Sequence, residues 1–349
     1  TGVQTCALPI SVLFLVLVFG LFGWLDEFLR QFISNKILLT LSFFGVIYLI
    51  NEILSLPFDY YNTFVIEERF GFNKSTKTIF WLDQLKGLLL AVVLGGTILA
   101  LITWLYTAIG ELAWLYAWGA ITVVSLFMTL FYSNIIVPLF NKQTPLGEGE
   151  LRDAIEAFAQ KAGFAINNIY VMDASKRSTK ANAYFTGFGA KKRIVLFDTL
   201  INDLDKDEIV AVLAHEIGHY KKKHTLQGMF ISICYTGIML FLLSLVLDNK
   251  DIAIALGGQS ASFHLGLIAF SIFFTPVSFV INVLSSIHSR RNEYQADGYA
   301  AGFGLADSLI SGLKKLSVKS LSNLNPDSLY VFFNYSHPTL LQRIKAMKK

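Results

Sequence analysis

The sequence predicts a mainly α-helical protein that crosses a membrane several times and carries a domain outside it with a small β-sheet. Of its 349 residues, 54% are hydrophobic and only 15% are charged, whereas charged residues make up about 25% of an ordinary soluble domain. A soluble chain of this length cannot bury so much apolar surface in one core, so the surplus is expected to face lipid. The polar residues are concentrated in two separate stretches, which predict the domain outside the membrane.

Six stretches are long and apolar enough to cross a bilayer as helices, because a crossing needs about 20 mostly apolar residues. We therefore expect a polytopic transmembrane helical bundle. The predicted spans are residues 8–25, 37–58, 85–106, 112–140, 226–247 and 264–286.

The polar residues between the fourth and fifth predicted spans have a mixed α/β pattern. Residues 152–162 and 207–224 are predicted helices, the second with Asp203 or Asp205 as its N-cap. Short β-rich runs are found at residues 169–172 and 193–197, and the second polar stretch is mostly helical in pattern. The chain thus divides into a membrane region at 1–140, the first part of a polar domain at 141–225, two membrane helices at 226–286, and the second part of the polar domain at 287–349.

The distribution of Lys and Arg predicts the orientation, because cytoplasmic loops carry an excess of both residues. Residues 58–84, residues 141–225 and the C-terminal tail are rich in them, whereas residues 26–36 and 248–263 are poor. Alternation of the spans places the basic loops on one side, so both polar stretches are expected in the cytoplasm, where they can form one site. The net charge of +4 is mild and does not indicate nucleic-acid binding.

Residues 215–219 read His-Glu-Ile-Gly-His, the H-E-x-x-H pattern found in metalloproteases. Because His215 and His219 are four residues apart, both imidazoles lie on one face of the predicted helix and suit two ligands of a tetrahedral zinc ion. Glu216 is placed beside them to take a proton from water at the metal. Two cysteines are too few for a cysteine-based zinc site, so we predict one Zn²⁺ per chain at the histidine pair.

A catalytic zinc site of this kind needs a third protein ligand and one open position. Residues 292–297, Asn-Glu-Tyr-Gln-Ala-Asp, follow the last predicted span on the same side of the membrane as the histidine pair. Glu293 is the predicted third ligand. Asp297, four residues later, is expected to accept a hydrogen bond from the free N–H of a ligand histidine. A surface helix with ordinary charges is the alternative.

The four remaining histidines are judged by their positions. His337 lies in the tail that must fold against the site, with Arg343 about two turns later, and it is either a donor to a tetrahedral oxyanion or a structural histidine. His224 and His288 lie near membrane boundaries and are weaker candidates. His264 falls at the far end of a span and is expected at the membrane interface, away from the site.

Residues 180–187, which include Asn182 and Ala183, form a further β-rich stretch. Two interpretations remain open for it. It is either an edge strand that pairs with an extended peptide substrate through its free backbone groups, or an ordinary strand within the sheet.

Together these motifs resemble the type I CAAX prenyl endopeptidases, a family of integral-membrane zinc metalloproteases, and we expect a bacterial homologue. The resemblance covers nearly the whole chain from about residue 12 onward. The matching segments are residues 213–219, 292–297 and 336–338 and, more discriminating, residues 64–74 and 136–142 of the membrane region.

The resemblance implies a helical chamber within the membrane, capped on the cytosolic side by the metalloprotease domain. It implies that C-terminal CAAX tripeptides, or similar peptides with or without a lipid, are cleaved at the membrane. The implied site consists of His215, His219 and Glu293 as zinc ligands, Glu216 as general base, His337 as a catalytic residue, Asp297 and Arg343 as supporting residues, and Asn182 with Ala183 as substrate contacts.

The family has seven spans, whereas six are predicted here, so we expect the first span to be missing from the N-terminus. The location implied is a bacterial inner membrane, or the endoplasmic reticulum in a eukaryote, with the site on the cytosolic side. The nearest alternative is a quality-control protease of the HtpX kind, which has fewer spans before the H-E-x-x-H helix. A transporter that carries a metal is less favoured, although Asn51 and Glu52 lie within a predicted span.

Overall fold

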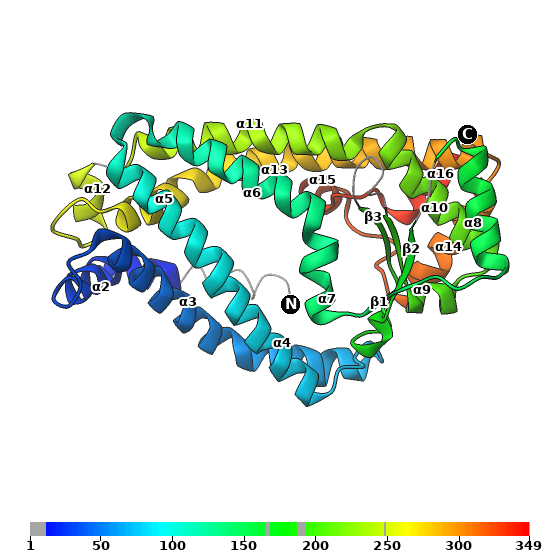
Figure 1. The fold of residues 1–349 in the computed structure, drawn as a ribbon, viewed down its shortest axis with the longest axis horizontal. Coiled ribbons are helices and arrows are strands. Elements are labelled where there is room, and N and C mark those ends of the chain that lie inside the picture. Colours follow the sequence, from blue (N-terminus) through cyan, green and yellow to red (C-terminus); the bar gives the residue numbers. More distant parts are fainter. Residues whose placement is uncertain (1–11, 165–167, 187–192, 248, 349) are drawn as a thin grey trace. The chain divides into compact units, whose positions relative to one another are not determined.

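The computed structural model describes residues 12–164, 168–186, 193–247 and 249–348. They form two compact units. We call Thr1–Tyr60, Leu85–Val124 and Ile231–Ser278 the membrane-helix unit, and Tyr61–Gln84, Ser125–Phe230 and Phe279–Lys349 the sheet-containing unit. Both units are mainly helical, and the second includes a four-stranded sheet (Figure 1), so the predicted fold class is confirmed.

Five helical stretches of the described residues are long and apolar enough to cross a membrane, and they coincide with the second to sixth predicted spans. They are Lys36–Glu67, formed by α3 (Lys36–Tyr61) and η1 (Asn62–Glu67); Lys77–Ala108, formed by α4 (Lys77–Leu90), η2 (Ala91–Gly95) and α5 (Gly96–Ala108); Gly110–Phe140, formed by η3 (Gly110–Leu112), α6 (Ala113–Ile135) and α7 (Val137–Phe140); α11 (His224–Ser244); and α13 (Phe263–Gly302).

The first predicted span, residues 8–25, differs from the prediction in its described part. It is a pair of helices, Val12–Val18 and α2 (Leu21–Arg30), which meet at an angle of 60°. Gly20, between them, has a φ of 61°, a left-handed conformation that ends a helix and that glycine adopts without strain.

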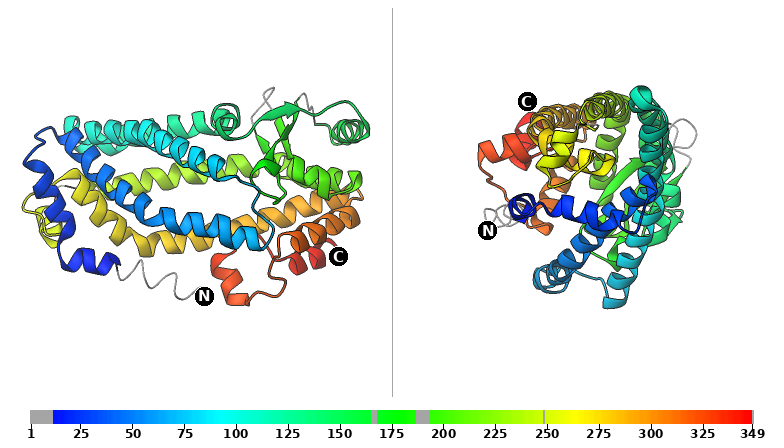
Figure 2. Two further views of the ribbon diagram at one scale, coloured as in Figure 1. Left: turned by 90° about the horizontal axis from the view of Figure 1, so that it is seen from below. Right: turned by 90° about the vertical axis from the view of Figure 1, so that its left-hand side faces the viewer.

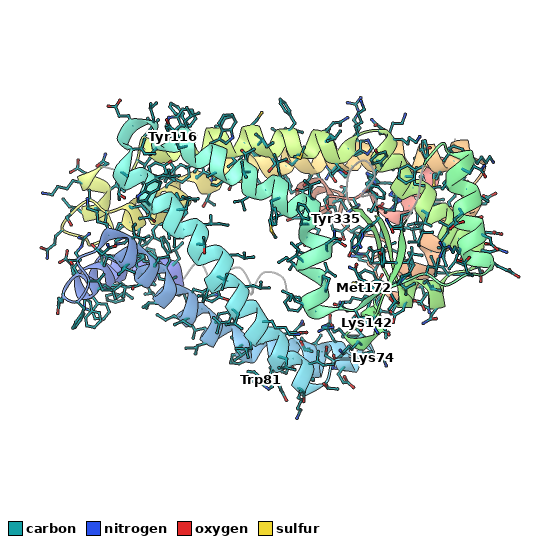
Figure 3. All side chains as sticks on the ribbon, in the orientation of Figure 1. Lys74, Trp81, Tyr116, Lys142, Met172 and Tyr335 are labelled. Carbon is teal, nitrogen blue, oxygen red and sulfur yellow. The ribbon has the colours of Figure 1, made fainter. Side chains whose placement is uncertain are left out.

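Large apolar side chains project from the membrane-crossing helices into the surroundings of the molecule. Trp81 and Tyr116, both labelled in Figure 3, are 50% and 55% exposed, and Phe58 is 75% exposed. Contiguous apolar surface of this kind is unfavourable in water but matches lipid tails. The exposed faces are therefore those expected of helices in a bilayer.

Within the membrane-helix unit, α2 packs directly against the turn that follows α12 (Lys250–Ala255). The backbone N–H of Gly23 donates to the carbonyl of Leu256 at 3.0 Å, and a Cβ on Gly23 would lie only 2.0 Å from the carbonyl carbon of Gly257. Only glycine permits this contact between the two backbones. Beside it, Phe43 of α3 and Leu265 of α13 are fully buried in one apolar cluster.

His264, predicted at the membrane interface away from the site, is 1% exposed and packs against Phe43 in the apolar core of the membrane-helix unit. Its Nε2 lies 2.7 Å from the Asp26 carboxylate and its Nδ1 lies 3.4 Å from the Thr40 hydroxyl. Arg30 donates to the same carboxylate at 3.0 Å. Asp26 has no exposed surface, and a buried carboxylate is tolerated only with such hydrogen-bond partners. This requirement explains why His264 is buried next to Asp26.

The sheet of the second unit has the strand order β1-β2-β4-β3. β2 and β4 are parallel, and β1 and β3 pair antiparallel to their neighbours. Both strands predicted from β-rich runs are confirmed as β2 and β4. The strand bounds are β1 (Gln143–Pro145), β2 (Ile169–Met172), β3 (Ala183–Thr186) and β4 (Arg193–Phe197).

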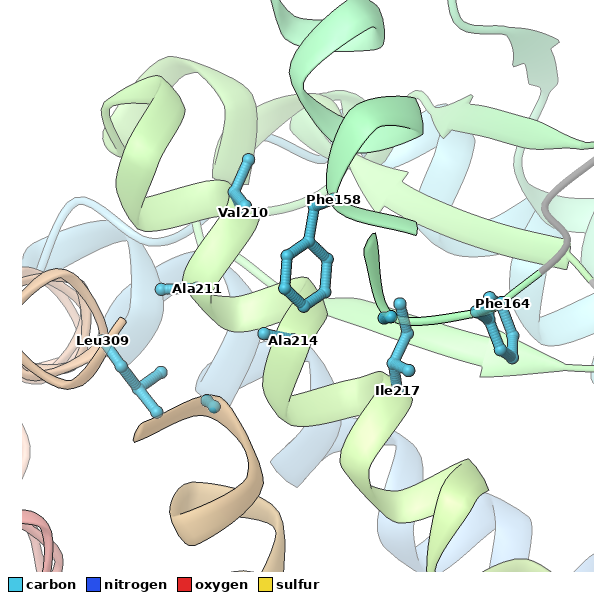
Figure 4. Close-up of a cluster of buried hydrophobic side chains, with 9 residues drawn as sticks. Phe158, Phe164, Val210, Ala211, Ala214, Ile217 and Leu309 are labelled. Carbon is cyan, nitrogen blue, oxygen red and sulfur yellow. The ribbon is translucent and has the colours of Figure 1, made fainter. Parts of the chain in front are cut away.

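Helix α10 packs against strand β3 of this sheet, and α8 and α14 pack against α10. Figure 1 labels the three helices near the sheet, and Figure 2 shows the same elements from two further sides. Their shared core contains Phe158 of α8, Ala211, Ala214 and Ile217 of α10, and Leu309 of α14 (Figure 4). Burying a side chain the size of Ile or Leu contributes about 1.5–3 kcal/mol, so this core holds α10 firmly. The helices and short elements of this unit are α8 (Glu150–Lys161), η4 (Ala174–Lys176), α9 (Asp198–Asp203), α10 (Lys206–Lys221), α14 (Ala306–Lys319), α15 (Ser328–Asn334) and α16 (Leu340–Met347).

The start of α10 is stabilised by a capping box and by an ion pair between buried Glu208 and the partly exposed Lys315. Asp205 is the N-cap, as one of the two sequence alternatives proposed, and the Glu208 side chain accepts from its backbone N–H. Glu208 also accepts from the Ser311 hydroxyl at 2.7 Å and from Lys315 Nζ at 2.8 Å, both on α14. Burial raises the pKa of Glu208, but the hydrogen bonds from Lys315, Ser311 and the Asp205 backbone outweigh it and leave the pKa below its ordinary value.

We predict that Glu208→Gln lowers the free energy of unfolding at pH 7 by about 1–2 kcal/mol, because a charge-assisted hydrogen bond and half of the capping box are weakened. Since the folded-state pKa of Glu208 is lowered, its stabilisation is present above the unfolded pKa and is lost as the pH falls. The difference between the two proteins should therefore shrink below about pH 4. Thermal unfolding in detergent measures it.

The control is Glu150→Gln, which removes an exposed partner of Lys206 and should change little at either pH, since exposed ion pairs contribute little. An equal effect of the two substitutions at pH 7 would contradict the role assigned to Glu208.

Candidate functional site

Helix α10 carries the predicted motif residues His215, Glu216 and His219 into the interior of the sheet-containing unit. Its apolar positions are buried, with Leu213 and Ile217 each 1% exposed, so the opposite face is left for polar side chains.

Gly218, within the motif, allows α10 to approach α13 very closely. A Cβ at this position would lie 3.0 Å from the Cβ of Tyr299 and 3.1 Å from the Cα of Ala296. Any larger residue would push the two helices apart. The x-x positions of the motif thus serve packing, while its histidines and glutamate face the site.

The approach of the two helices brings Glu293 of α13 against the histidine pair. His215 Nε2 and His219 Nε2 are 3.1 Å apart, and the Glu293 carboxylate oxygens lie 3.5 Å and 3.3 Å from them. One ligand atom from each residue lies within 4.8 Å of the others. Two imidazole nitrogens and one carboxylate, largely buried, form a donor set that fits a divalent transition-metal ion.

Asp297 lies one helical turn after Glu293 and contacts the other side of His215. Its Oδ1 is 2.9 Å from His215 Nδ1, and Arg343 of α16 donates to both carboxylate oxygens at 2.6 Å and 2.8 Å. Because Asp297 accepts the Nδ1 proton, the lone pair of His215 is directed from Nε2 toward Glu293 and His219. The structure thus brings both predicted supporting residues to the cluster.

The carboxylates around His215 strongly favour a positive charge on this ring. Burial lowers its pKa, but the hydrogen bonds to Asp297 and Glu293 outweigh burial and raise the pKa of His215 to about 9. Imidazole binds metals in its neutral form, so a metal ion bound here displaces this proton and itself balances the negative charge. The surroundings of the cluster are therefore suited to a cation.

A cavity of about 430 Å³ opens onto the three grouped side chains. Glu216 and His337 also line it, as do Asn182 and Ala183. Burial raises the pKa of the Glu216 carboxyl. His337 Nδ1 lies 3.1 Å from a Glu293 oxygen, while 64% of its side chain is exposed. All nine residues predicted for the site thus lie in the cavity wall or in contact with a residue that does.

Strand β3 is at the edge of the described sheet, since it pairs with β4 and has no further neighbour among the described strands. The edge position of residues 180–187 is therefore confirmed for the described part, while pairing with a peptide stays a prediction; residues beyond 186 lie outside the described range. The Asn182 carbonyl accepts from the Phe197 N–H of β4. By antiparallel alternation, the backbone groups of Ala183 and Phe185 point away from β4.

The segment that leads into this edge strand is held by residues 67–83, which overlap residues 64–74, one of the segments that carry the family resemblance. The Lys74 N–H donates to the Arg177 carbonyl and the Thr179 N–H to the Phe72 carbonyl, each at 3.0 Å. These bonds form a short antiparallel bridge.

Two ion pairs reinforce the same connection. Arg177 donates to both oxygens of Asp83 at 2.7 Å and 2.9 Å, and Lys180 Nζ lies 2.6 Å from Glu67. The bidentate pair fixes the direction of its side chains as well as their distance. Residues 67–83 therefore hold the entry to β3 in place, two residues before Asn182.

Of the two histidines that were weaker candidates, His224 lies at the cluster. Its Nδ1 is 3.0 Å from His219 Nδ1, and its Nε2 is 3.0 Å from Gln295 Oε1. The position of His224, five residues after His219, was the available sequence signal, but the turn that folds it back was not predictable.

The prediction of one helix over 207–224 is wrong at its end, because Lys223 has a φ of 60° and separates α10 from α11. His288 Nε2 is buried and has no hydrogen-bond partner among the described residues.

Comparisons with known proteins agree with this geometry. A model of peptidase family M48 matches residues 145–349, and a model described as the CAAX prenyl protease N-terminal region, with five membrane helices, matches residues 4–142. A CAAX prenyl protease 1 homolog of Oryza sativa subsp. japonica is 40% identical over 320 residues, which are 90% of this chain and 74% of that protein. CAAX prenyl protease 1 of Saccharomyces cerevisiae is 38% identical over 325 residues, 88% of this chain and 72% of that protein.

A solved structure has the same fold. The crystal structure of S. mikatae Ste24p matches with a TM-score of 0.89 and 35% identity, over 95% of this chain and 82% of that one. The H-E-x-x-H helix, the grouped ligands, the membrane helices and these matches lead to the same conclusion: the chain belongs to peptidase family M48, a family of metallopeptidases, and has the membrane region of the CAAX prenyl proteases.

Proposed function

We propose that this protein is an integral-membrane zinc endopeptidase of the CAAX prenyl protease type. The observation that carries the proposal is the grouping of His215, His219 and Glu293, from two helices far apart in sequence, beside a cavity that the edge strand β3 also lines. The names of the relatives support the same activity.

Zinc is the metal that this donor set fits best, because tetrahedral sites with two histidines and one glutamate leave a fourth position open for chemistry. When bound, the ion supplies a Lewis acid that lowers the pKa of water to about 7 and polarises the carbonyl of the peptide to be cleaved. His215, His219 and Glu293 hold it, and Asp297 and Arg343 keep His215 in orientation.

Glu216 is the proposed general base. Glu216 lines the cavity with the two histidines, and burial raises the pKa of its carboxyl above the ordinary value, which favours the return of a proton that it has accepted. It takes a proton from the attacking water and delivers it to the leaving amine.

His337 is the proposed donor to the oxyanion. Its Nδ1 faces Glu293, so its Nε2 is the nitrogen left to meet a substrate, and its side chain is accessible from the cavity. A donor aimed at the oxygen on which charge develops stabilises the transition state more than the ground state.

The proposed substrate is an extended peptide segment, with or without an attached lipid, that pairs with the free edge of β3. Main-chain hydrogen bonds from Ala183 and Phe185 would hold it in register, and Asn182 would contact it from the cavity wall. The Asn182 side chain now accepts from the Ala183 N–H at 2.9 Å, so it must turn away when a peptide takes that bond. Substrates of this kind reach the enzyme at the bilayer.

The Lys- and Arg-rich loops support a cytosolic site, in a bacterial inner membrane or the endoplasmic reticulum. They also support the proposed division into membrane regions at 1–140 and 226–286 and protease regions at 141–225 and 287–349. The match of a five-helix membrane region to residues 4–142 favours the CAAX type over the HtpX type, whose members have fewer spans before the H-E-x-x-H helix.

We predict that Glu216→Gln retains zinc and the thermal stability of the parent but lowers kcat by about 10²–10⁴-fold, the usual contribution of a general base. Metal analysis together with cleavage of prenylated and unprenylated fluorogenic peptides measures this. Glu156→Gln, on the exposed face of α8, is the matched control and should be fully active. Turnover by Glu216→Gln close to that of the parent would remove Glu216 from the mechanism.

A second prediction tests the edge strand. Ala183→Pro removes one N–H from the free edge and should raise KM about 5–10-fold, the equivalent of one lost hydrogen bond, with metal content unchanged. Ala183→Gly keeps the N–H and should resemble the parent. Equal KM values for the two variants would show that the substrate does not pair at this position.

A further inference from the structure

His224 is the first residue of α11, and the left-handed turn at Lys223 returns its ring to the end of α10. The ring is 6% exposed and is held from both sides. Its Nδ1 lies 3.0 Å from His219 Nδ1, and its Nε2 lies 3.0 Å from Gln295 Oε1. Neither His224 nor Gln295 has a role in the function proposed above.

The positions of the protons follow from the chemistry of the three groups. An amide oxygen only accepts, so the hydrogen of the bond to Gln295 is on His224 Nε2. In a neutral His224 ring the Nδ1 is then an acceptor, and the hydrogen of the next bond must be on His219 Nδ1. This leaves an unprotonated Nε2 on His219, which is the atom that lies 3.1 Å from His215 Nε2 and 3.3 Å from Glu293.

We propose that Gln295 and His224 are positioning residues that hold His219 in the tautomer and orientation needed to bind the metal. The proposal rests on the zinc site proposed above and extends it to the second histidine. The two ligand histidines thus have different supports: His215 has the Asp297 carboxylate, with Arg343 behind it, and His219 has a neutral chain of His224 and Gln295.

The neutral support has a physical reason. Glu293, Glu216 and Asp297 already bring three carboxyl groups to the cluster, whereas Arg343 is the cation that pairs with Asp297. A further carboxylate behind His219 would add like charge to a buried site, where repulsion is weakly screened. A neutral His224 donates from Nε2 to the Gln295 oxygen and accepts at Nδ1 from His219, so it orients His219 without adding charge.

His224→Leu tests the proposal, because it removes both hydrogen bonds while keeping a buried side chain. We expect the dissociation constant for Zn²⁺, measured by competition with a chromophoric chelator, to rise about 10–100-fold, as for other residues that orient a ligand. The visible absorption spectrum of the Co²⁺-loaded protein should also change, since the orientation of one ligand is lost.

His224→Gln is the rescue variant. Its amide oxygen can accept from His219 and its amide nitrogen can donate to Gln295, so metal affinity should return to within a few-fold of the parent. Gln295→Met removes the acceptor of the His224 Nε2–H and should bind metal more weakly than the parent. Gln227→Leu is the control on the same helix, since its amide donates to the Lys222 carbonyl away from the cluster.

Parent-like metal affinity and Co²⁺ spectrum in His224→Leu would overturn the proposal. An equal loss of affinity in His224→Leu and His224→Gln would overturn it as well, because only a purely packing role would fail to distinguish a glutamine, which can restore the two hydrogen bonds, from a leucine, which cannot. The zinc site itself is tested separately: if the parent protein binds no metal, or if Glu216→Gln cleaves normally, the proposed function fails whatever the His224 variants do.

Discussion

The close approach of α10 and α13 at Gly218 is the constraint on which the site depends. Because Gly218 has no side chain, the backbone of Ala296 lies directly against the H-E-x-x-H turn. Glu293 and Asp297, on either side of Ala296, then reach the Nε2 and the Nδ1 of His215. Helix α13 is 40 residues long and carries both Glu293 and Asp297. The position of the third ligand is therefore determined by helix packing and not by a flexible loop.

Concentrated negative charge is the cost of this arrangement, and the surrounding residues are arranged to offset it. Arg343 pairs with Asp297 in a bidentate geometry and also lies 3.5 Å from Glu293. The high pKa of His215 has the same cause. In each case a positive partner compensates for carboxylates that have lost contact with water. The protein can therefore stay folded with several buried carboxylates, and the cluster remains able to bind a cation.

The edge strand depends on a different set of contacts. Residues 67–83, which lie at the ends of two membrane-crossing helices, hold the chain at Arg177 and Lys180 by backbone bonds and two ion pairs. The membrane-region motif therefore has a structural task at the protease site. In the other unit, the buried pair of Asp26 and His264, with the more exposed Arg30 beside it, likewise places a carboxylate next to complementary partners.

Local patterns in the sequence determined most elements of this protein. Apolar length predicted six spans, and five of them are helices long and apolar enough to cross a membrane. β-rich runs predicted β2 and β4, and helical spacing placed His215 with His219 and Glu293 with Asp297, because these are properties of a single segment. Contacts between distant segments could not be read in this way. The burial of His264 requires Asp26, and the return of His224 to His219 requires a left-handed residue at Lys223, a conformation that a lysine rarely adopts. The meeting of α10 with α13 and the free edge of β3 were likewise decided by tertiary packing, since each depends on which surfaces bury one another.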